Sequence, residues 1–216
     1  MIAHAQRKPT TLLYDENEEL REKRSDTNSD GTFDEFVYYQ SGSPSRAVRD
    51  TDHDGTVDLW LSYDSTGQPN LQERDNDADG KIDQWINFKN GRAITQRDDH
   101  NQDGLADVEI SYSDGKPSLR VEDTNLDGQD DRWIHYENGQ ARLIEEDHSG
   151  DGKPDLRARL NNFGHKLNEE HDTNQNGTFE TKVFFESNVM VRVCLLYTSD
   201  AADEGLGVDL GGRRII

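Results

Sequence analysis

The chain has 216 residues, and its 45 Asp and Glu outnumber its 24 Lys and Arg, which gives a formal net charge of -21. This length fits one or two domains. The acidity argues against nucleic acid as a partner, because Lys and Arg are scattered and form no basic patch. No run of 18 apolar residues occurs, so no membrane span is predicted. Leu, Ile, Val and Phe make up about a fifth of the chain, which is close to the limit for unaided folding.

Residues 194–216 differ from the rest of the chain. They resemble one reading frame of a transposase sequencing adapter, because CLLYTSDAADE and GVDLGGRRII match its two parts and the gap between them has the length of an index. We expect a non-native tail and a natural chain that is cut near Val193. The only cysteine, Cys194, falls in this tail, so neither disulfides nor thiolate sites are expected in the remainder.

The rest of the chain is a tandem repeat. Related hexapeptides start at intervals of 24 or 25 residues, at Asp26, Asp50, Asp75, Asp99, Asp123, Asp147 and Asp172. Each repeat has an Asp-rich loop, an apolar run that ends in an aromatic residue, and a Gly turn followed by a polar run. Such units are stabilised by their neighbours. The sequence predicts a repeat array over residues 26–193, and a degenerate or truncated first repeat over residues 1–25.

Every loop follows the nine-position pattern D-x-[DNS]-x-[DN]-G-x-x-[DE]. Positions 1, 3, 5 and 9 carry side-chain oxygens that are candidate metal ligands. In chain order these ligands are Asp26, Asn28, Asp30 and Asp34; Asp50, Asp52, Asp54 and Asp58; Asp75, Asp77, Asp79 and Asp83; Asp99, Asn101, Asp103 and Asp107; Asp123, Asn125, Asp127 and Asp131; Asp147, Ser149, Asp151 and Asp155; and Asp172, Asn174, Asn176 and Glu180. They include 22 carboxylates. Outside the tail the other 19 acids face 22 bases, so the loops account for the net negative charge.

These residue types suit calcium, which takes about 6–8 oxygen ligands at roughly 2.3–2.6 Å. Side chains at positions 1, 3 and 5 can surround one side of an ion, and glycine at position 6 permits a sharp turn. A carbonyl at position 7 and the carboxylate at position 9 can complete the shell. Magnesium fits less well, because it retains water and demands a rigid octahedron. We therefore expect seven sites with Ca²⁺ as the cofactor.

Two other interpretations of the loops compete with calcium. Asp, Asn and Gly also form ordinary turns, but seven loops in register, each with an acid at position 9, exceed what turns require. An EF-hand needs a Glu at position 12 and a helix on both sides. Position 12 is apolar in every repeat, and the residues that follow each loop alternate with a period of two, as in strands.

The predicted fold class is all-β, an antiparallel meander of about seven β-hairpin repeats in an open or spiral sheet. In the second repeat Val57, Leu59, Leu61 and Tyr63 point to one face of a strand. Positions 12 and 14 are apolar or aromatic throughout, and we expect that face to be the core. Turns are expected at Ser41-Gly42, Thr66-Gly67, Asn90-Gly91, Asp114-Gly115, Asn138-Gly139 and Phe163-Gly164. Asn-Gly and Asp-Gly favour two-residue type I′ hairpins.

Parts of the repeat resemble two known families of repeats. The loops, above all residues 148–156, are similar to the calcium loops of FG-GAP/VCBS repeats. The hairpins look more weakly like YD (Rhs-type) repeats, as at Tyr63-Asp64 and Tyr14-Asp15. A repeat of 24 residues is less than half an FG-GAP propeller blade, so a propeller is not expected. Both resemblances imply a secreted or cell-surface bacterial protein, of which this chain is a fragment. Met1 to Gln6 contain no apolar signal core, so either the protein stays inside the cell or Met1 is not the natural start.

The predicted function is calcium binding that stabilises an extracellular repeat scaffold. No enzyme is expected, since the carboxylates recur at ligand positions and no nucleophile–base set occurs. The alternative is a carbohydrate- or protein-binding adhesion module that uses an exposed row of Trp60, Trp85 and Trp133, with a glycan or cell-surface protein as partner. His53 lies at a variable loop position, and we expect it to be a solvated surface residue.

Overall fold

The computed structural model describes residues 9–195 and the backbone of residues 208 and 209. Most of the expected tail, and residues 1–8 of the expected first repeat, lie outside the described residues. The described part contains 17 β-strands and no helix, so the predicted all-β class is confirmed. No segment of the described chain forms a helix suited to crossing a membrane.

The chain divides into two compact units, residues 1–104 and residues 105–216. The strands of the first unit are β1 (Thr10–Tyr14), β2 (Leu20–Ser25), β3 (Glu35–Gln40), β4 (Ser43–Arg49), β5 (Leu59–Tyr63), β6 (Pro69–Arg74), β7 (Gln84–Lys89) and β8 (Arg92–Asp98). Those of the second are β9 (Val108–Ser113), β10 (Lys116–Glu122), β11 (Arg132–Glu137), β12 (Gln140–Glu146), β13 (Leu156–Leu160), β14 (Lys166–His171), β15 (Thr181–Glu186), β16 (Val189–Leu195) and β17 (Val208–Asp209).

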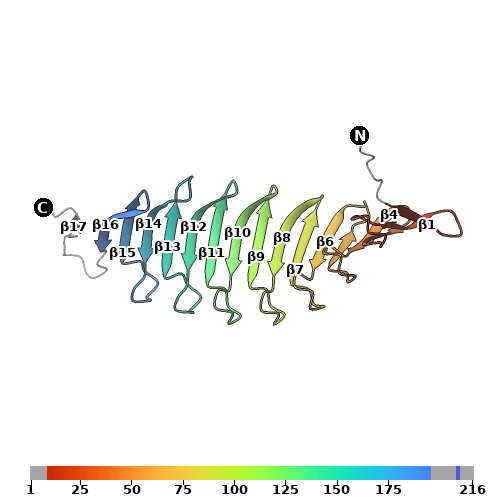
Figure 1. Ribbon diagram of the computed structural model, residues 1–216. Helices are drawn as coiled ribbons and strands as arrows, with labels where there is room; N and C mark the ends of the chain where they lie inside the picture. The colour runs from red at the N-terminus through yellow and green to blue at the C-terminus, as the bar shows by residue number, and fades with distance from the viewer. Residues whose placement is uncertain (1–8, 196–207, 210–216) are drawn as a thin grey trace, which may run out of the picture. The chain divides into compact units, whose positions relative to one another are not determined.

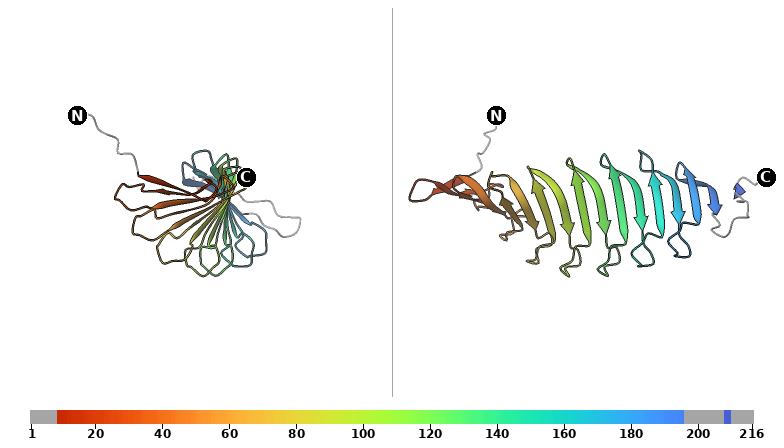
Figure 2. Two further views of the ribbon diagram at one scale, coloured as in Figure 1. Left: turned by 90° about the vertical axis from the view of Figure 1, so that its right-hand side faces the viewer. Right: turned by 180° about the vertical axis from the view of Figure 1, so that it is seen from behind.

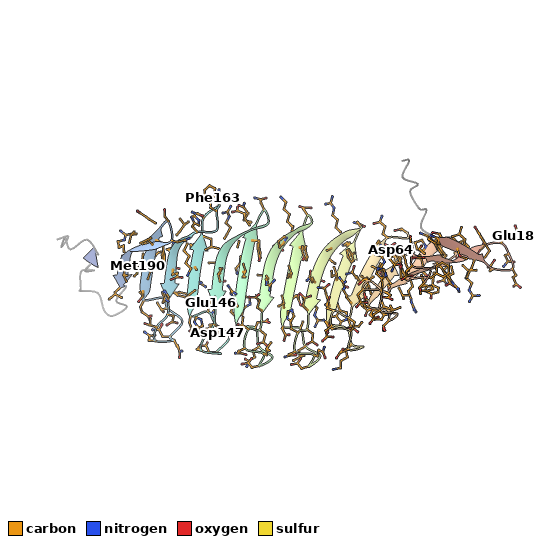
Figure 3. All side chains as sticks on the ribbon, viewed as in Figure 1. Glu18, Asp64, Glu146, Asp147, Phe163 and Met190 are labelled. Carbon is orange, nitrogen blue, oxygen red and sulfur yellow. The ribbon has the colours of Figure 1, made fainter. Side chains whose placement is uncertain are left out.

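Within each unit the strands form an open antiparallel meander, as predicted. Each strand pairs with the strand that precedes it and the strand that follows it, from β1 to β8 and again from β9 to β17. In the second unit the short turns lie along one edge and the Asp-rich loops along the other (Figures 1 and 2). Figure 3 places Phe163 at the turn edge and Asp147 at the loop edge. The meander thus gathers the candidate ligands of each unit along one side of its sheet.

Four of the expected turns have the backbone of type I′ turns. Their two central residues both have positive φ, as at Asn90 (52°) and Gly91 (70°), or Asn138 (54°) and Gly139 (81°). Asn, Asp and Gly tolerate this region best, so the prediction for the Asn-Gly and Asp-Gly pairs is confirmed. Ser41-Gly42 adopts the same conformation.

The turns at Thr66-Gly67 and Phe163-Gly164 differ, because three residues, rather than two, lie between the hydrogen-bonded residues that close them. Asp64 donates its N–H to the carbonyl of Gln68 at 2.8 Å, and Gly67 donates to the carbonyl of Asp64 at 3.0 Å. Asp64 Oδ1 accepts the N–H groups of Thr66 and Gln68 at 2.8 and 3.0 Å. The side chain of Asp64 therefore replaces a second left-handed residue in shaping this turn.

The expected core face, which carries positions 12 and 14, holds four of the five buried apolar residues, Ala47, Leu59, Val108 and Ala158, but it is not fully buried. Position 12 is half-buried in six repeats and buried only at Ala158. Ala47 pairs with Leu61 and Val48 with Trp60, so these two buried residues point to opposite faces of the sheet. Among the described residues, the strands in close contact are adjacent in sequence, so no second layer within the described part of either unit covers a face of its sheet. The alternation of apolar residues predicts a strand but not what covers it.

Asp64 provides a test of the three-residue turn at residues 65–67. The Thr66 hydroxyl, followed by the backbone N–H of Gln68, lowers the pKa of Asp64 below its ordinary value. Because the pKa in the folded state is lower than in the unfolded state, the ionised carboxylate stabilises the fold at neutral pH, and this contribution is lost as pH falls through the lowered pKa. Asp64→Ala should therefore lower the melting temperature in EDTA more at neutral pH than at pH about 3.

Thermal melts followed by circular dichroism would measure this difference. Asp64→Asn is the matched control, because it keeps an oxygen acceptor and should lose less stability than Asp64→Ala at neutral pH. An equal loss from Asp64→Ala at both pH values would show that its charge does not act on this turn.

Candidate metal sites in the Asp-rich loops

Position 1 of each loop holds an aspartate that organises the loop backbone. It follows directly after a strand, as Asp26 follows β2 and Asp147 follows β12. In all seven loops its Oδ2 accepts the N–H of the glycine at position 6, at 2.6–3.0 Å. These glycines have φ of 82–99°, a region that other residues adopt only with strain. The carboxylate and the glycine together fold the loop back on itself.

Position 9 closes the loop with a second carboxylate. In six loops its side chain accepts the N–H of position 2, at 2.6–3.2 Å. Its backbone carbonyl accepts the N–H of the aspartate at position 1 of the next loop, as Asp34 does from Asp50 at 2.9 Å and Asp131 from Asp147 at 2.8 Å. Position 9 therefore links neighbouring loops within a unit.

Positions 3 and 5 lie at the exposed tip of the loop. In the second loop Asp52 Oδ1 accepts the N–H of Asp54 at 3.2 Å, and Asp54 Oδ1 accepts the N–H of Thr56 at 2.7 Å. The third loop repeats this pattern with Asp77 and Asp79. One oxygen of each carboxylate therefore accepts a backbone N–H, and the other oxygen takes no part in that hydrogen bond.

Carboxylate oxygens of positions 1, 3 and 9 come together in the second and third loops. Ligand atoms of Asp50, Asp52 and Asp58 lie within 4.8 Å of one another, and those of Asp75, Asp77 and Asp83 do the same. Position 5 belongs to neither cluster. Each of these two clusters has the spacing to hold a metal ion.

The other five loops have an amide or a hydroxyl in place of the carboxylate at position 3, namely Asn28, Asn101, Asn125, Ser149 and Asn174. They keep the bond from position 6 to position 1. The fourth loop lies at the division between the units, since Asp99, Asn101 and Asp103 belong to the first and Asp107 to the second. For these five loops the predicted ligand sets stay predictions.

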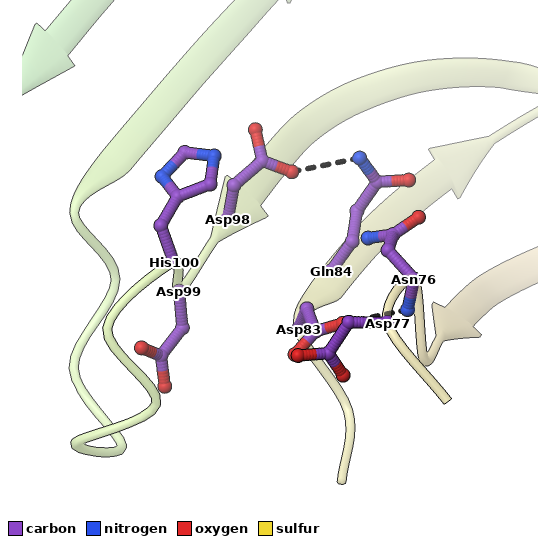
Figure 4. A pocket seen from close by; sticks show the side chains of 7 residues that line it. All are labelled: Asn76, Asp77, Asp83, Gln84, Asp98, Asp99 and His100. Atoms are coloured by element: carbon purple, nitrogen blue, oxygen red, sulfur yellow. Dashed lines mark hydrogen bonds between the residues drawn. The ribbon is translucent and has the colours of Figure 1, made fainter. Parts of the chain in front are cut away.

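The loops contain most of the buried side chains of the described chain. Twelve aspartates at positions 1 and 9 are at most 9% exposed, whereas only five apolar residues are buried to that degree. Figure 4 shows Asp77 and Asp83 in a hollow that Asp98 and Asp99 also line. Carboxylates this close repel one another, and burial strengthens the repulsion because less water screens them.

One buried oxygen in the third loop has no hydrogen-bond partner. Asp75 is 4% exposed, and its Oδ2 accepts the N–H of Gly80 at 2.8 Å. Its Oδ1 is inaccessible to solvent and accepts no hydrogen bond. An unsatisfied buried oxygen costs free energy, and a cation held between Asp75, Asp77 and Asp83 would remove that cost.

Three loop carboxylates have shifted pKa values, and hydrogen bonds from Asn28 and Thr32 lower the pKa of one of them, Asp30. Burial raises the pKa of Asp147, but the N–H groups of Gly150 and Gly152 outweigh it, so that the pKa lies below its ordinary value. Burial also raises the pKa of Asp130, and the charges of Asp123 and Asp131 raise it further. Asp130 occupies position 8, which the sequence pattern left out of the ligand set. Its pKa is raised mainly by burial, and the repulsion from Asp123 and Asp131 is the smaller part that a cation would relieve.

The structure also shows two contacts between neighbouring loops that the sequence pattern did not predict. His53 is exposed as expected, but its Nδ1 lies 3.3 Å from Asp34 Oδ2 of the preceding loop. Gln102 Nε2 donates to Asp77 Oδ2 of the preceding loop at 2.8 Å. His53 and Gln102 both occupy position 4. This position varies among the repeats, so the sequence pattern gave no basis for predicting the two contacts.

The three tryptophans of the alternative interpretation are half-buried rather than exposed. Trp60 and Trp85 lie on either side of Glu73 across β5, β6 and β7. In the second unit Trp133 pairs with Glu145, which forms an ion pair with Arg157. A glycan or protein partner for this face stays a prediction.

No protein-family model matches the chain, and no curated protein matches it. The case for metal binding therefore rests on the geometry of the loops.

Asp26 tests the structural role of position 1 without any metal. It is 1% exposed and accepts the N–H groups of Ser29 at 2.6 Å and Gly31 at 2.9 Å. Asp26→Ala leaves these donors without their acceptor, which should lower the free energy of unfolding in EDTA by about 1–3 kcal/mol. Urea denaturation followed by circular dichroism would measure the loss. Asp30→Ala, at exposed position 5 of the same loop, should cost less, and an equal loss would contradict this role.

Proposed function

We propose that this chain is a calcium-binding repeat protein in which the ions stabilise the scaffold. The carboxylate clusters of the second and third loops, with the unpartnered oxygen of Asp75, are the observation that carries the proposal. All the clustered atoms are oxygens, which are the ligands of Ca²⁺ and Mg²⁺ rather than of softer metals. Calcium is the better match, because the loops offer many carboxylate oxygens and Ca²⁺ accepts a more irregular arrangement of ligands than Mg²⁺ does.

In this proposal the ion acts through charge and position. It offsets the repulsion among the buried carboxylates, and it joins the end of one strand (position 1) to the start of the next (position 9). The ion thereby fixes the register of the strands that flank the loop. The proposal assigns the clustered carboxylates to ion binding and loop structure, and it includes no catalytic step.

The proposed setting is extracellular, where millimolar calcium can occupy weak sites. Extracellular calcium modules bind with Kd of about 10⁻⁴–10⁻³ M. With free calcium tenfold above Kd, each occupied site adds about 1.4 kcal/mol of stability. Seven sites would together add about 10 kcal/mol, comparable to the stability of an ordinary domain. The chain would then reach its full stability only after export, where calcium is millimolar.

The first test is a calcium titration of the full chain. Calcium should increase the β-sheet signal in far-UV circular dichroism and raise the melting temperature above the value in EDTA, whereas magnesium at the same concentration should do less. Isothermal titration calorimetry should count close to seven ions. A chain that is equally stable in EDTA and in calcium would contradict the proposal and leave the loops as simple turns.

The variant Asp77→Asn tests whether Asp77 is a metal ligand or only a turn residue. Asparagine keeps the oxygen that accepts the N–H of Asp79, but it removes one charge from the cluster with Asp75 and Asp83. In EDTA the variant should be as stable as the wild type or more stable, because repulsion falls. In calcium it should be less stable, because the ion loses a charged ligand.

The matched control is Asp64→Asn, which removes the same charge in the same unit but in a hairpin turn. Its effect should be the same in EDTA and in calcium. If Asp77→Asn also behaved alike under both conditions, position 3 would not be a ligand. Thermal melts of the two variants, with and without calcium, give all the values needed.

A further inference from the structure

Gln102 belongs to the fourth loop, but its side chain reaches into the carboxylate cluster of the third. Its backbone has φ of 59°, and its N–H donates to Asp99 Oδ1 at 2.7 Å. Its Nε2 lies 2.8 Å from Asp77 Oδ2 and 3.5 Å from Asp83 Oδ1. Two of the three clustered carboxylates are therefore bridged by a donor from the next repeat.

This amide group occupies a place suited to a cation. Its N–H hydrogens carry partial positive charge and face Asp77 and Asp83, while the buried Oδ1 of Asp75 in the same cluster has no partner. Gln102 Oε1 accepts a hydrogen bond from Lys81 Nζ at 3.1 Å. Half a turn of the amide exchanges its oxygen and nitrogen, which would point Oε1 at the cluster and release Lys81.

We infer that Gln102 Oε1 is a ligand from the next repeat for a Ca²⁺ ion held by Asp75, Asp77 and Asp83. This inference rests on the proposed calcium function and deepens it. The ion would then bind two repeats at once and hold the tip of the fourth loop against the third. A neutral amide oxygen suits this role, because calcium shells combine carboxylates with the side-chain carbonyls of Asn and Gln.

The second loop provides a natural comparison within the same unit. Its cluster of Asp50, Asp52 and Asp58 matches that of the third loop. The residue at position 4 of the following loop is Ala78, which has no ligand atom. Ala78 has φ of 61°, close to the 59° of Gln102, so the backbone accommodates either residue. Exchanging the two side chains should therefore move the extra ligand from one site to the other.

The test uses the full-length chain labelled with ¹⁵N and titrated with calcium. The N–H of Gly80 reports on the third site, because it donates to Asp75 at 2.8 Å, and the N–H of Gly55 reports on the second site through Asp50 at 2.8 Å. Gln102→Ala should raise the calcium midpoint at Gly80 about tenfold, the lower end of what losing a supporting group costs a metal site. The midpoint at Gly55 should not change.

The reciprocal variant Ala78→Gln should lower the midpoint at Gly55 and leave Gly80 unchanged, and it keeps the test decisive if Gln102→Ala folds poorly. An unchanged or lower midpoint at Gly80 in Gln102→Ala would overturn the inference, since the amide would then be neutral or a competitor, while calcium binding would stand. If neither glycine responded to millimolar calcium in the wild type, the proposed function and the inference would both fail.

Discussion

The repulsion among carboxylates at the loop edge is the constraint on which the rest of this structure depends. Twelve aspartates at positions 1 and 9 are buried, and the described chain has few buried apolar residues to offset their cost. Hydrogen bonds from backbone N–H groups satisfy much of this charge, as Gly55 and Gly80 do for Asp50 and Asp75. They do not neutralise it, because a hydrogen bond leaves the net charge of the cluster unchanged.

This constraint explains why the hairpins consist of paired strands alone, whereas the loops contain many hydrogen bonds to carboxylates. The described strands of each unit are in close contact with their neighbours in sequence, so each hairpin adds little buried apolar area. The links between repeats must therefore come from the strand pairing and from the loops. Position 9 supplies one such link by accepting the N–H of the next position 1, as between Asp58 and Asp75. A cation in each loop would add a second link at the same place, where the charge is densest.

Much of the fold could be predicted from the sequence, because it is encoded locally. The 24-residue period, the alternation in β5 and the Asn90-Gly91 turn each depend on residues that are close in sequence. The apolar face could be predicted, but its degree of burial could not, because alternation does not reveal whether a second layer covers the sheet. The contact of Gln102 with Asp77 was also beyond prediction, since it depends on where a left-handed residue in one loop directs its side chain toward another.

Hydrogen exchange measured by mass spectrometry, in EDTA and in calcium, is the most direct test of the claim that cations stabilise the loop edge. Peptides that cover the loops, such as residues 50–58 and 75–83, should exchange quickly in EDTA and become strongly protected in calcium. Peptides of the turns at residues 90–91 and 138–139 should gain less protection. Loops that are fully protected in EDTA and unchanged by calcium would contradict the account, since backbone hydrogen bonds alone would then hold the buried carboxylates.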